Sequence, residues 1–149
     1  MGRYLALNLA QEGSDVVICD INKNALKETE ELIKNYNISC TSLTLDLRDK
    51  NNIDALVEKT ITNHGKVDLV FNNAGVVVAS SFLDMEEGNW DWCNDINYNS
   101  LVYCSKSFLP YLMKSEETAL VNTSSIFGII TTPNNTCLLY TSPSPRDPI

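Results

Sequence analysis

Segments with the pattern of buried strands alternate with segments of helical periodicity, and this alternation constrains the fold more than any other feature. The expected strands are residues 15–20, 39–45, 67–71 and 119–125, and the expected helices are residues 2–10, 23–35, 49–65 and 85–113. Short connections between such elements favour right-handed strand–helix–strand crossovers, which place the strands in one parallel sheet with helices on both faces. We therefore expect an α/β fold with a doubly wound parallel sheet, in which a helix comes first.

Length and charge limit the organisation of the chain and its partners. With 149 residues, 44% of them apolar, the sequence can form one domain with a hydrophobic core. The net charge of −8 argues against a nucleic-acid partner, because such partners require clustered Lys and Arg. No stretch approaches the roughly 18 consecutive apolar residues of a membrane span, so no membrane segment is expected in the visible chain.

The cysteines predict a reducing, cytoplasmic compartment and no metal site. They form no Cys-x-x-Cys pair and fall in expected strands and helices, so reduced thiols are favoured over a disulfide framework or a zinc site. The five are Cys19, Cys40, Cys93, Cys104 and Cys137. The single histidine, His64, closes a polar helix, and we expect it to face solvent.

The third expected strand ends abruptly in polar and small residues. Residues 67–71 are apolar apart from one aspartate, and Asn72, Asn73, Ala74 and Gly75 follow at once. In open α/β sheets ligands bind just beyond the carboxyl ends of the strands, where amides can bind a ligand and glycine allows close backbone approach. The alternative is an ordinary turn, since Asn and Gly are common turn formers.

Two strand ends and one glycine have the spacing of a dinucleotide-binding unit. Gly2 opens a helix and Asp20 ends the next strand eighteen residues later, close to the roughly twenty residues that place a carboxylate on the adenosine ribose. Asp20 would accept both ribose hydroxyls and repel a 2′-phosphate, so it favours NAD over NADP. Asp46 ends another strand and, with Leu47, could border the adenine ring. The alternatives are a plain helix start for Gly2 and helix caps for the two aspartates.

The motifs together resemble the short-chain dehydrogenase/reductase family over residues 2–136. They are Asn72-Asn73-Ala74-Gly75, Ile96-Asn97-Tyr98-Asn99-Ser100 and Asn122-Thr123-Ser124-Ser125-Ile126-Phe127-Gly128, with Pro133 beyond. The resemblance implies a Rossmann-like sheet, a nicotinamide cofactor and hydride transfer to or from an alcohol or carbonyl carbon.

It also implies that residues 72–75 brace the sheet and contact the cofactor. Asn97 would lie in a kinked helix that holds a water relay, and Ser125 would hydrogen-bond the substrate oxygen. On residue type alone, Asn97 could instead be a helix-surface amide and Ser125 a cap or turn hydroxyl.

The family's catalytic tyrosine and lysine are absent where the resemblance places them. The tyrosine follows the serine by about thirteen residues and the lysine comes four later, but the chain has Leu138 and Ser142 at these positions. Tyr140 is the nearest tyrosine, and four residues beyond it stands Ser144 in a Ser-Pro-Ser-Pro run that cannot continue a helix. We therefore assign no catalytic role to Tyr140.

Both ends of the chain depart from the family. The family's first strand and the earlier glycines of its Gly-rich turn would lie before Met1, with Gly2 matching the last of those glycines. Residues 137–149 have no periodicity, and their sequence resembles translated adapter sequence from an assembled transcript. We expect a partial NAD(P)-binding domain over residues 1–136, followed by a disordered tail over residues 137–149. Without the first strand, we expect the isolated chain to be unstable or to aggregate.

Two functions from different classes follow from these residues. The first is an oxidoreductase of the short-chain dehydrogenase type, of which this chain is an inactive central portion. The alternative is a non-catalytic Rossmann-like nucleotide-binding or scaffolding protein, suggested by the missing Tyr-Lys pair. The substrate, a small alcohol or carbonyl compound, stays open because the loops that would complete its pocket are absent. Family members commonly form homo-oligomers, and residues 89–111 could supply half of such an interface.

Overall fold

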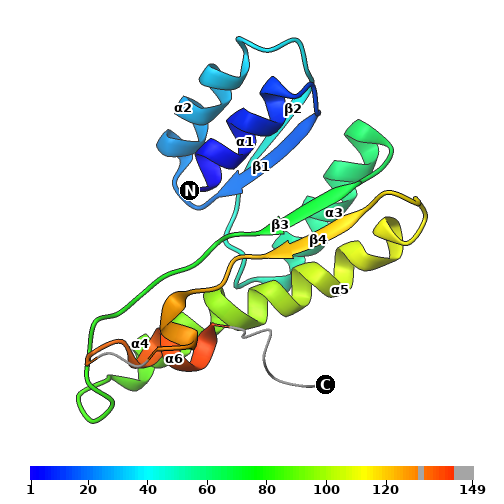
Figure 1. Cartoon of the computed structure of the whole chain (residues 1–149). Helices are drawn as coiled ribbons and strands as arrows, with labels where there is room; N and C mark the ends of the chain where they lie inside the picture. The colour runs from blue at the N-terminus through cyan, green and yellow to red at the C-terminus, as the bar shows by residue number, and fades with distance from the viewer. Residues whose placement is uncertain (131–132, 143–149) are drawn as a thin grey trace.

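The computed structural model describes residues 1–130 and 133–142 (Figure 1). Within these ranges, strands and helices alternate as the sequence predicts. The helices are α1 (Gly2–Gln11), α2 (Lys23–Ile33), α3 (Lys50–His64), α4 (Glu87–Asn94), α5 (Ser100–Leu112) and α6 (Thr136–Thr141), with a π-helix at Asp95–Asn99 and a 3-10 turn at Ile126–Gly128. The strands are β1 (Val16–Asp20), β2 (Cys40–Thr44), β3 (Leu69–Asn72) and β4 (Ala119–Asn122). In the part of the chain described, no helix is both long and apolar enough to cross a membrane.

The four strands form two parallel pairs rather than one continuous sheet. β1 pairs with β2 from Val16↔Cys40 onward, and β3 pairs with β4 from Leu69↔Ala119 onward. β1 and β3 do not pair, and Figure 1 shows the two pairs as separate arrows with their inner edges facing each other. The parallel α/β arrangement is therefore confirmed, and the sheet is divided at its centre.

Helices cover opposite faces of this divided sheet. On one side, Ala6 and Ala10 of α1 and Ile33 of α2 form a buried cluster with Val16 of β1. The other cluster consists of buried Leu56 and Val57 of α3 and Phe108 of α5. It is surrounded by partly buried apolar residues from β1, β2 and β3, so α3 and α5 span both strand pairs.

Local sequence signals explain the ends of helices α2 and α3. Asn22 caps α2 by accepting from the backbone N–H groups of Asn24 and Ala25, and Asp49 caps α3 in the same way. Gly65 ends α3 in the left-handed conformation at φ 75°, which glycine adopts without steric cost. Pro110 lies inside α5, which runs on to Leu112. A proline this close to the helix end removes only one of the last intrahelical hydrogen bonds.

The expectation for His64 is wrong. Its side chain is only 7% exposed, because the last turn of α3 packs beside the amino ends of β1 and β2. Its Nε2 lies 2.9 Å from the Thr41 hydroxyl, and its Nδ1 lies 3.8 Å from an Asp15 carboxylate oxygen. The helical pattern correctly places His64 at the end of α3. It gives no information about Thr41 and Asp15, which are distant in sequence and contact the His64 ring.

The buried thiols on the α3–α5 side should be unreactive in the folded chain. Burial, together with Asp20, raises the pKa of Cys19 from 9.0 to about 11, and burial raises that of Cys104 to about 12. A thiol whose pKa is raised by folding stabilises the chain below about pH 9, and this stability is lost as the pH rises through 11. We expect iodoacetamide at about pH 8, in cold ammonium sulfate, to leave both thiols unmodified until urea is added, as mass spectrometry would detect. Rapid native-state alkylation would contradict this burial.

Candidate active site

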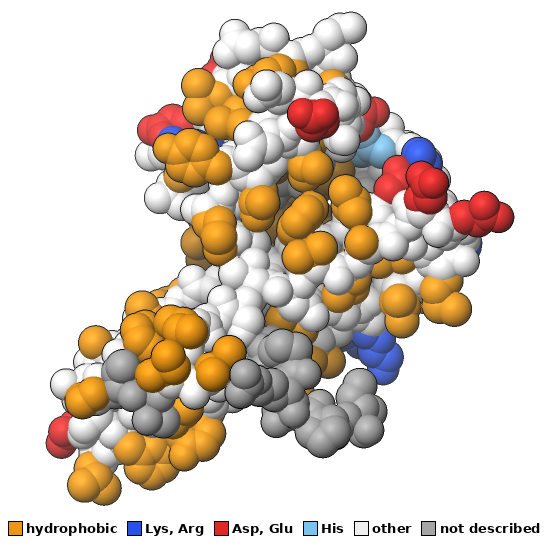
Figure 2. Space-filling view, viewed as in Figure 1, with side chains coloured by type: hydrophobic (Ala, Val, Ile, Leu, Met, Phe, Trp, Pro, Cys, Tyr) orange, Lys and Arg blue, Asp and Glu red, His pale blue; other side chains and the backbone are white. Residues whose placement is uncertain are grey.

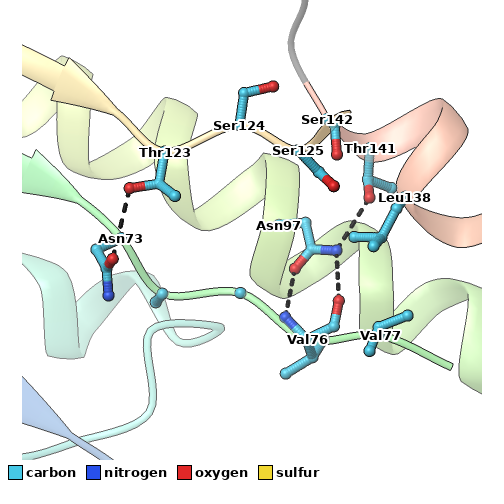
Figure 3. A pocket seen from close by; sticks show the side chains of 12 residues that line it. Asn73, Val76, Val77, Asn97, Thr123, Ser124, Ser125, Leu138, Thr141 and Ser142 are labelled. Atoms are coloured by element: carbon cyan, nitrogen blue, oxygen red, sulfur yellow. Dashed lines mark hydrogen bonds between the residues drawn. The ribbon is translucent and has the colours of Figure 1, made fainter. Parts of the chain in front are cut away.

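A cavity of about 230 Å³ lies beyond the carboxyl ends of β3 and β4, where the chain leaves both strands (Figure 3). Its walls come from the loop after β3, the π-helix, the loop after β4 and α6. The lining residues are Asn73, Ala74, Gly75, Val76, Val77, Asn97, Thr123, Ser124, Ser125, Leu138, Thr141 and Ser142. None of these side chains is an acid or a base at neutral pH, so the cavity is uncharged and is lined by both polar and apolar groups.

Asn97 joins two parts of the cavity wall through its side-chain amide. It lies in the π-helix Asp95–Asn99, and its Oδ1 accepts from the Val76 N–H at 2.8 Å while its Nδ2 donates to the Val76 carbonyl at 2.9 Å. The same Nδ2 also donates to the Thr141 hydroxyl at 3.0 Å (Figure 3). One side chain therefore joins the loop after β3 to α6. A π-turn carries one extra residue, and such turns are frequent at functional sites.

Ser125 and Thr123 supply hydroxyl groups to the cavity from the segment after β4. The Ser125 hydroxyl accepts from the Phe127 N–H at 3.2 Å and caps the short 3-10 turn. Thr123 donates to the Asn73 amide oxygen at 3.5 Å, which links the ends of the two neighbouring strands. Ser125 is thus a cap, as its residue type allowed, and at the same time part of the cavity wall.

Helix α6 presents the two positions where a tyrosine and a lysine were expected. Leu138 and Ser142 both line the cavity, on the wall that faces Asn97 (Figure 3). Tyr140 points elsewhere: it is 65% exposed and contacts the rings of Phe82 and Trp90. The helix spans Thr136–Thr141, whereas a disordered tail was expected from residue 137 onward. The expected disorder of residues 143–149 lies outside the described residues.

The other expected cofactor residues lie outside the cavity, along the same edge of the sheet. Gly2 begins α1 beside the loop after β3, because a Cβ on Gly2 would lie 3.0 Å from the Asn73 amide nitrogen. Asp20, exposed at the end of β1, accepts from the Asn22 N–H at 2.8 Å, and its second carboxylate oxygen has no hydrogen-bond partner among the described residues. The structure therefore places Gly2 next to Asn73, whereas Asp20 lies apart from both, at the carboxyl end of β1.

Asp46 and Leu47 follow the end of β2, on the same edge of the sheet. Arg48 binds both carboxylate oxygens of Asp46, at 2.6 to 3.1 Å. Its hydrogen bonds hold the pKa of Asp46 below the usual range. The Leu47 side chain packs against the α3–α5 core cluster.

Sequence reasoning missed Val76 and Thr141. Val76 takes part through its backbone groups, for which side-chain identity gives no signal. Thr141 is 2% exposed and accepts from Asn97, yet it stands in a segment whose composition suggested a tail. Only the three-dimensional position of α6 reveals its role.

Comparison with known proteins identifies the chain. A model of the short chain dehydrogenase family matches residues 1–142. The chain belongs to the short-chain dehydrogenase family. This confirms the resemblance on which the motif assignments rest.

Similar members of the family come from bacteria and animals. The chain is 30% identical over 133 residues to the CLA biosynthesis dehydrogenase/reductase of Lactiplantibacillus plantarum, covering 89% of the chain and 46% of that protein. It is 33% identical over 138 residues to dehydrogenase/reductase SDR family member 6 of Rattus norvegicus, covering 93% and 53%. The crystal structure of carveol dehydrogenase from Mycobacterium avium in complex with NAD superposes with a TM-score of 0.89 at 25% identity, covering 94% of this chain and 56% of that one. The chain thus spans about half the length of these short-chain dehydrogenases.

Asn97→Leu should release the loop after β3 in this short-chain dehydrogenase. The substitution leaves the Val76 N–H and carbonyl without their partner, at a cost of about 1 to 3 kcal/mol for each group that stays buried and unsatisfied. We expect the Val76 amide to lose its protection from hydrogen exchange, measured by NMR in cold ammonium sulfate.

Two variants control for this effect. Asn97→Asp retains the acceptor for the Val76 N–H and should keep part of the protection. Asn99→Ala removes only the hydrogen bond to Asp95 within the π-helix, and should leave Val76 unchanged. Equal exchange at Val76 in all three variants would show that Asn97 does not position the loop.

Proposed function

We propose that this chain forms the dinucleotide-binding part of an NAD(P)-dependent oxidoreductase that transfers hydride between a nicotinamide and an alcohol or carbonyl substrate. The observation that carries the proposal is the cavity at the ends of β3 and β4, into which Asn97 and the Ser125 segment converge. In open parallel sheets this edge is where ligands bind. The carveol dehydrogenase that resembles the chain was crystallised with NAD, which supports the choice of cofactor.

The residues present fit such a cofactor. A side chain at position 2 would press on the Asn73 amide, so Gly2 keeps the start of α1 open for a close approach, and a helix N-terminus favours phosphate groups. We assign contacts with the cofactor to Gly2, Asn73, Ala74 and Gly75. When bound, the nicotinamide supplies or accepts the hydride. The chain's own part is to orient it against Ser125, whose hydroxyl would hydrogen-bond the substrate oxygen.

Asp20 is proposed to select NAD over NADP, with Asp46 and Leu47 beside the adenine ring. The carboxylate oxygen of Asp20 that does not bind the Asn22 N–H would accept from the ribose hydroxyls and repel a 2′-phosphate. We expect Asp20→Ala to reduce the preference for NADH over NADPH by about 10-fold or more, which corresponds to about 1.4 kcal/mol of differential binding.

Titration of nicotinamide fluorescence in cold ammonium sulfate measures both affinities. Asp15→Ala is the matched control, because Asp15 lies at the opposite end of β1, where its carboxylate accepts from the Ser39 N–H. NADPH binding equal to NADH binding in the parent chain would refute the assignment of Asp20. Failure to bind either nucleotide would refute the proposed function itself.

The chain as written is proposed to bind the cofactor without turning over substrate. Leu138 and Ser142 occupy the wall where an acid–base group and its partner are needed, and neither side chain ionises near neutral pH. The same observation favours the second candidate, a non-catalytic nucleotide-binding or scaffolding protein. Reading the gene past codon 136 separates the two. An in-frame Tyr-x-x-x-Lys supports the enzyme, and a genuine stop codon after the Ser-Pro tail supports the non-catalytic protein.

The domain boundary, the cellular location and the oligomeric state are also proposals. The family model matches residues 1–142, beyond the expected boundary at residue 136, so we propose that only the Ser-Pro segment after residue 142 is foreign to the family domain. A cytoplasmic location is proposed from the cysteine pattern, and free thiols at Cys19, Cys40 and Cys104 are compatible with it. A homo-oligomer built on the α4–α5 side is proposed from the family, and sedimentation of a verified full-length protein would test it.

A further inference from the structure

Lys23 and Lys27 form the only pair of basic residues in the sequence that stand four positions apart. Both lie in α2, where this spacing places two side chains on the same face of the helix, one turn apart. Like charges at this spacing repel each other, so the pair by itself is unfavourable for the helix. On the face that Figure 2 displays, Lys and Arg side chains stand singly. The pair in α2 is therefore a local concentration of positive charge in a chain of net charge −8.

The ammonium groups of this pair are not neutralised by carboxylates of the described residues. Neither Lys23 nor Lys27 takes part in an ion pair there. The acidic neighbours of Lys27 on the helix surface are Glu30 and Glu31, and both carboxylates bind other groups. Glu30 accepts from the Ser42 hydroxyl at 2.9 Å, and Glu31 accepts from the next lysine of the helix at 2.7 Å. The two ammonium groups are therefore available to an external anion.

The two lysines border a cavity of about 290 Å³ between α2 and β2. Its other lining residues are Leu26, Glu30, Ser42 and Thr44. Because β1 and β2 are parallel, the helix that connects them runs in the opposite direction. Lys23, at the start of α2, therefore lies toward the end of β2 that carries Thr44, and Glu30 lies beside Ser42. The cavity is thus basic at one end and acidic at the other.

We propose that this cavity binds a small hydroxylated phosphomonoester, at a site separate from that of the nicotinamide cofactor. The phosphate would lie between the ammonium groups of Lys23 and Lys27 and accept from the Thr44 hydroxyl. A phosphomonoester is close to a dianion at neutral pH, so its charge matches two ammonium groups where a carboxylate would match one. A hydroxyl of the ligand would donate to the Glu30 carboxylate oxygen that Ser42 does not bind.

The acidic end of the cavity limits what the ligand can carry. Glu30 would repel a second anionic group, so the ligand has its phosphate at one end and neutral donors at the other. Asp20 stands opposite Thr44 in the β1–β2 register, and its exposed carboxylate would oppose a nucleotide phosphate at that end of β1. No residue lines both this cavity and the one beyond β3 and β4. The ligand is therefore a second molecule rather than part of the cofactor.

Titration with glycerol phosphate, followed by NMR of the isotope-labelled full chain, tests this site. The buffer is cold trimethylamine N-oxide, which favours the compact state, because sulfate would compete for the same cavity. We expect saturable shifts of the amide resonances of residues 23–30 and 42–44, with an affinity that falls as salt is added. Glycerol, which lacks the phosphate, should cause no shifts. Inorganic phosphate, which lacks the hydroxyls, should bind about 3- to 10-fold more weakly than glycerol phosphate.

Variants of exposed lysines in α2 separate this site from a general effect of charge. Lys23→Gln combined with Lys27→Gln should weaken glycerol phosphate binding by at least about 10-fold. Lys34→Gln is the matched control, because it removes the same charge from the end of α2, but Lys34 pairs with Glu31 and does not line the cavity. It should change the affinity by less than about 2-fold. Unshifted resonances of β3 and β4 show that each variant keeps the fold.

Three results would overturn the proposal. The first is the absence of saturable shifts at residues 23–30 and 42–44 with glycerol phosphate. The second is an equal loss of affinity in Lys34→Gln and in the double variant, which would show that the anion responds only to the total charge of α2. The third is displacement of glycerol phosphate by saturating NADH, which would assign the lysines to the cofactor site. We expect NADH to leave the affinity for glycerol phosphate unchanged.

Discussion

On heating, the purified 149-residue chain is expected to lose its secondary structure gradually and to aggregate, without a cooperative transition. Within residues 1–130 and 133–142, the backbone groups of Val17 and Cys19 in β1 and of Leu69 and Phe71 in β3 have no strand partner. Each such group that is buried and unsatisfied costs about 1 to 3 kcal/mol, against a usual net stability of about 5 to 15 kcal/mol. The apolar side of β3 and β4 adds to the instability, because Leu69 and Val121 remain 44% and 39% exposed.

Circular dichroism on heating, with a hydrophobic dye present, measures this behaviour. Gradual loss of ellipticity with early dye binding is the expected result. Ile53→Ala provides a reference for the folded state that exists in the cold, because Ile53 has no exposed surface and its truncation costs about 2 to 5 kcal/mol. Met113→Ala, at a position that is 77% exposed, should change nothing. A sharp, reversible transition of the parent chain would show that the unpaired edges are satisfied in solution.

The double substitution Leu138→Tyr, Ser142→Lys is expected to introduce hydride transfer into this chain, which we propose to be inactive. Both positions line the cavity on the wall that faces Asn97; Leu138 lies in α6 and Ser142 is the residue that follows the helix, four positions later. A tyrosine there would add a proton donor and acceptor to an uncharged cavity. The lysine charge nearby would lower the phenol's pKa toward neutrality. A positioned acid–base group contributes about 10²- to 10⁴-fold in rate, so NADH oxidation with a panel of simple ketones should rise by at least about 100-fold.

The matched control moves the tyrosine by one position. Leu139→Tyr with Ser142→Lys adds the same groups, but residue 139 is rotated by about 100° around the helix and is not among the residues that line the cavity. Nicotinamide fluorescence reports cofactor binding separately from turnover. If both double variants bind NADH and neither oxidises it, the assignment of positions 138 and 142 is wrong. If only the first variant gains activity, the register of α6 is established.

Sequence reasoning located the strands and the ends of most helices because their causes are local. Asn22 and Gly65 show this well: a capping amide and a left-handed glycine act within a few residues of their own position. The cavity at the end of β3 was also expected, because strand-end position follows from alternation. The division of the sheet is not visible in the alternation, which favours one parallel sheet, because no residue of β1 or β3 alone reveals whether the two strands are neighbours.

The missed features depend on contacts between distant segments. His64 is buried because Thr41 and Asp15 lie beside the end of α3, and neither is near it in sequence. The conformation of residues 136–141 depends on tertiary contacts such as the hydrogen bond between Thr141 and Asn97, which overrides a composition typical of a tail. Periodicity carries no information about such pairs.

The π-helix at Asp95–Asn99 sets α4 and α5 out of phase with each other. Its wider turn holds an additional residue, so side chains on its two sides are offset by about 100° from where one continuous α-helix would place them. Removing a single residue there would not simply shorten the segment. It would turn α4 about its axis relative to α5, and Cys93 and Phe108 could no longer both keep their buried positions. We therefore expect insertions and deletions among relatives to avoid residues 95–99, even where the side chains themselves vary.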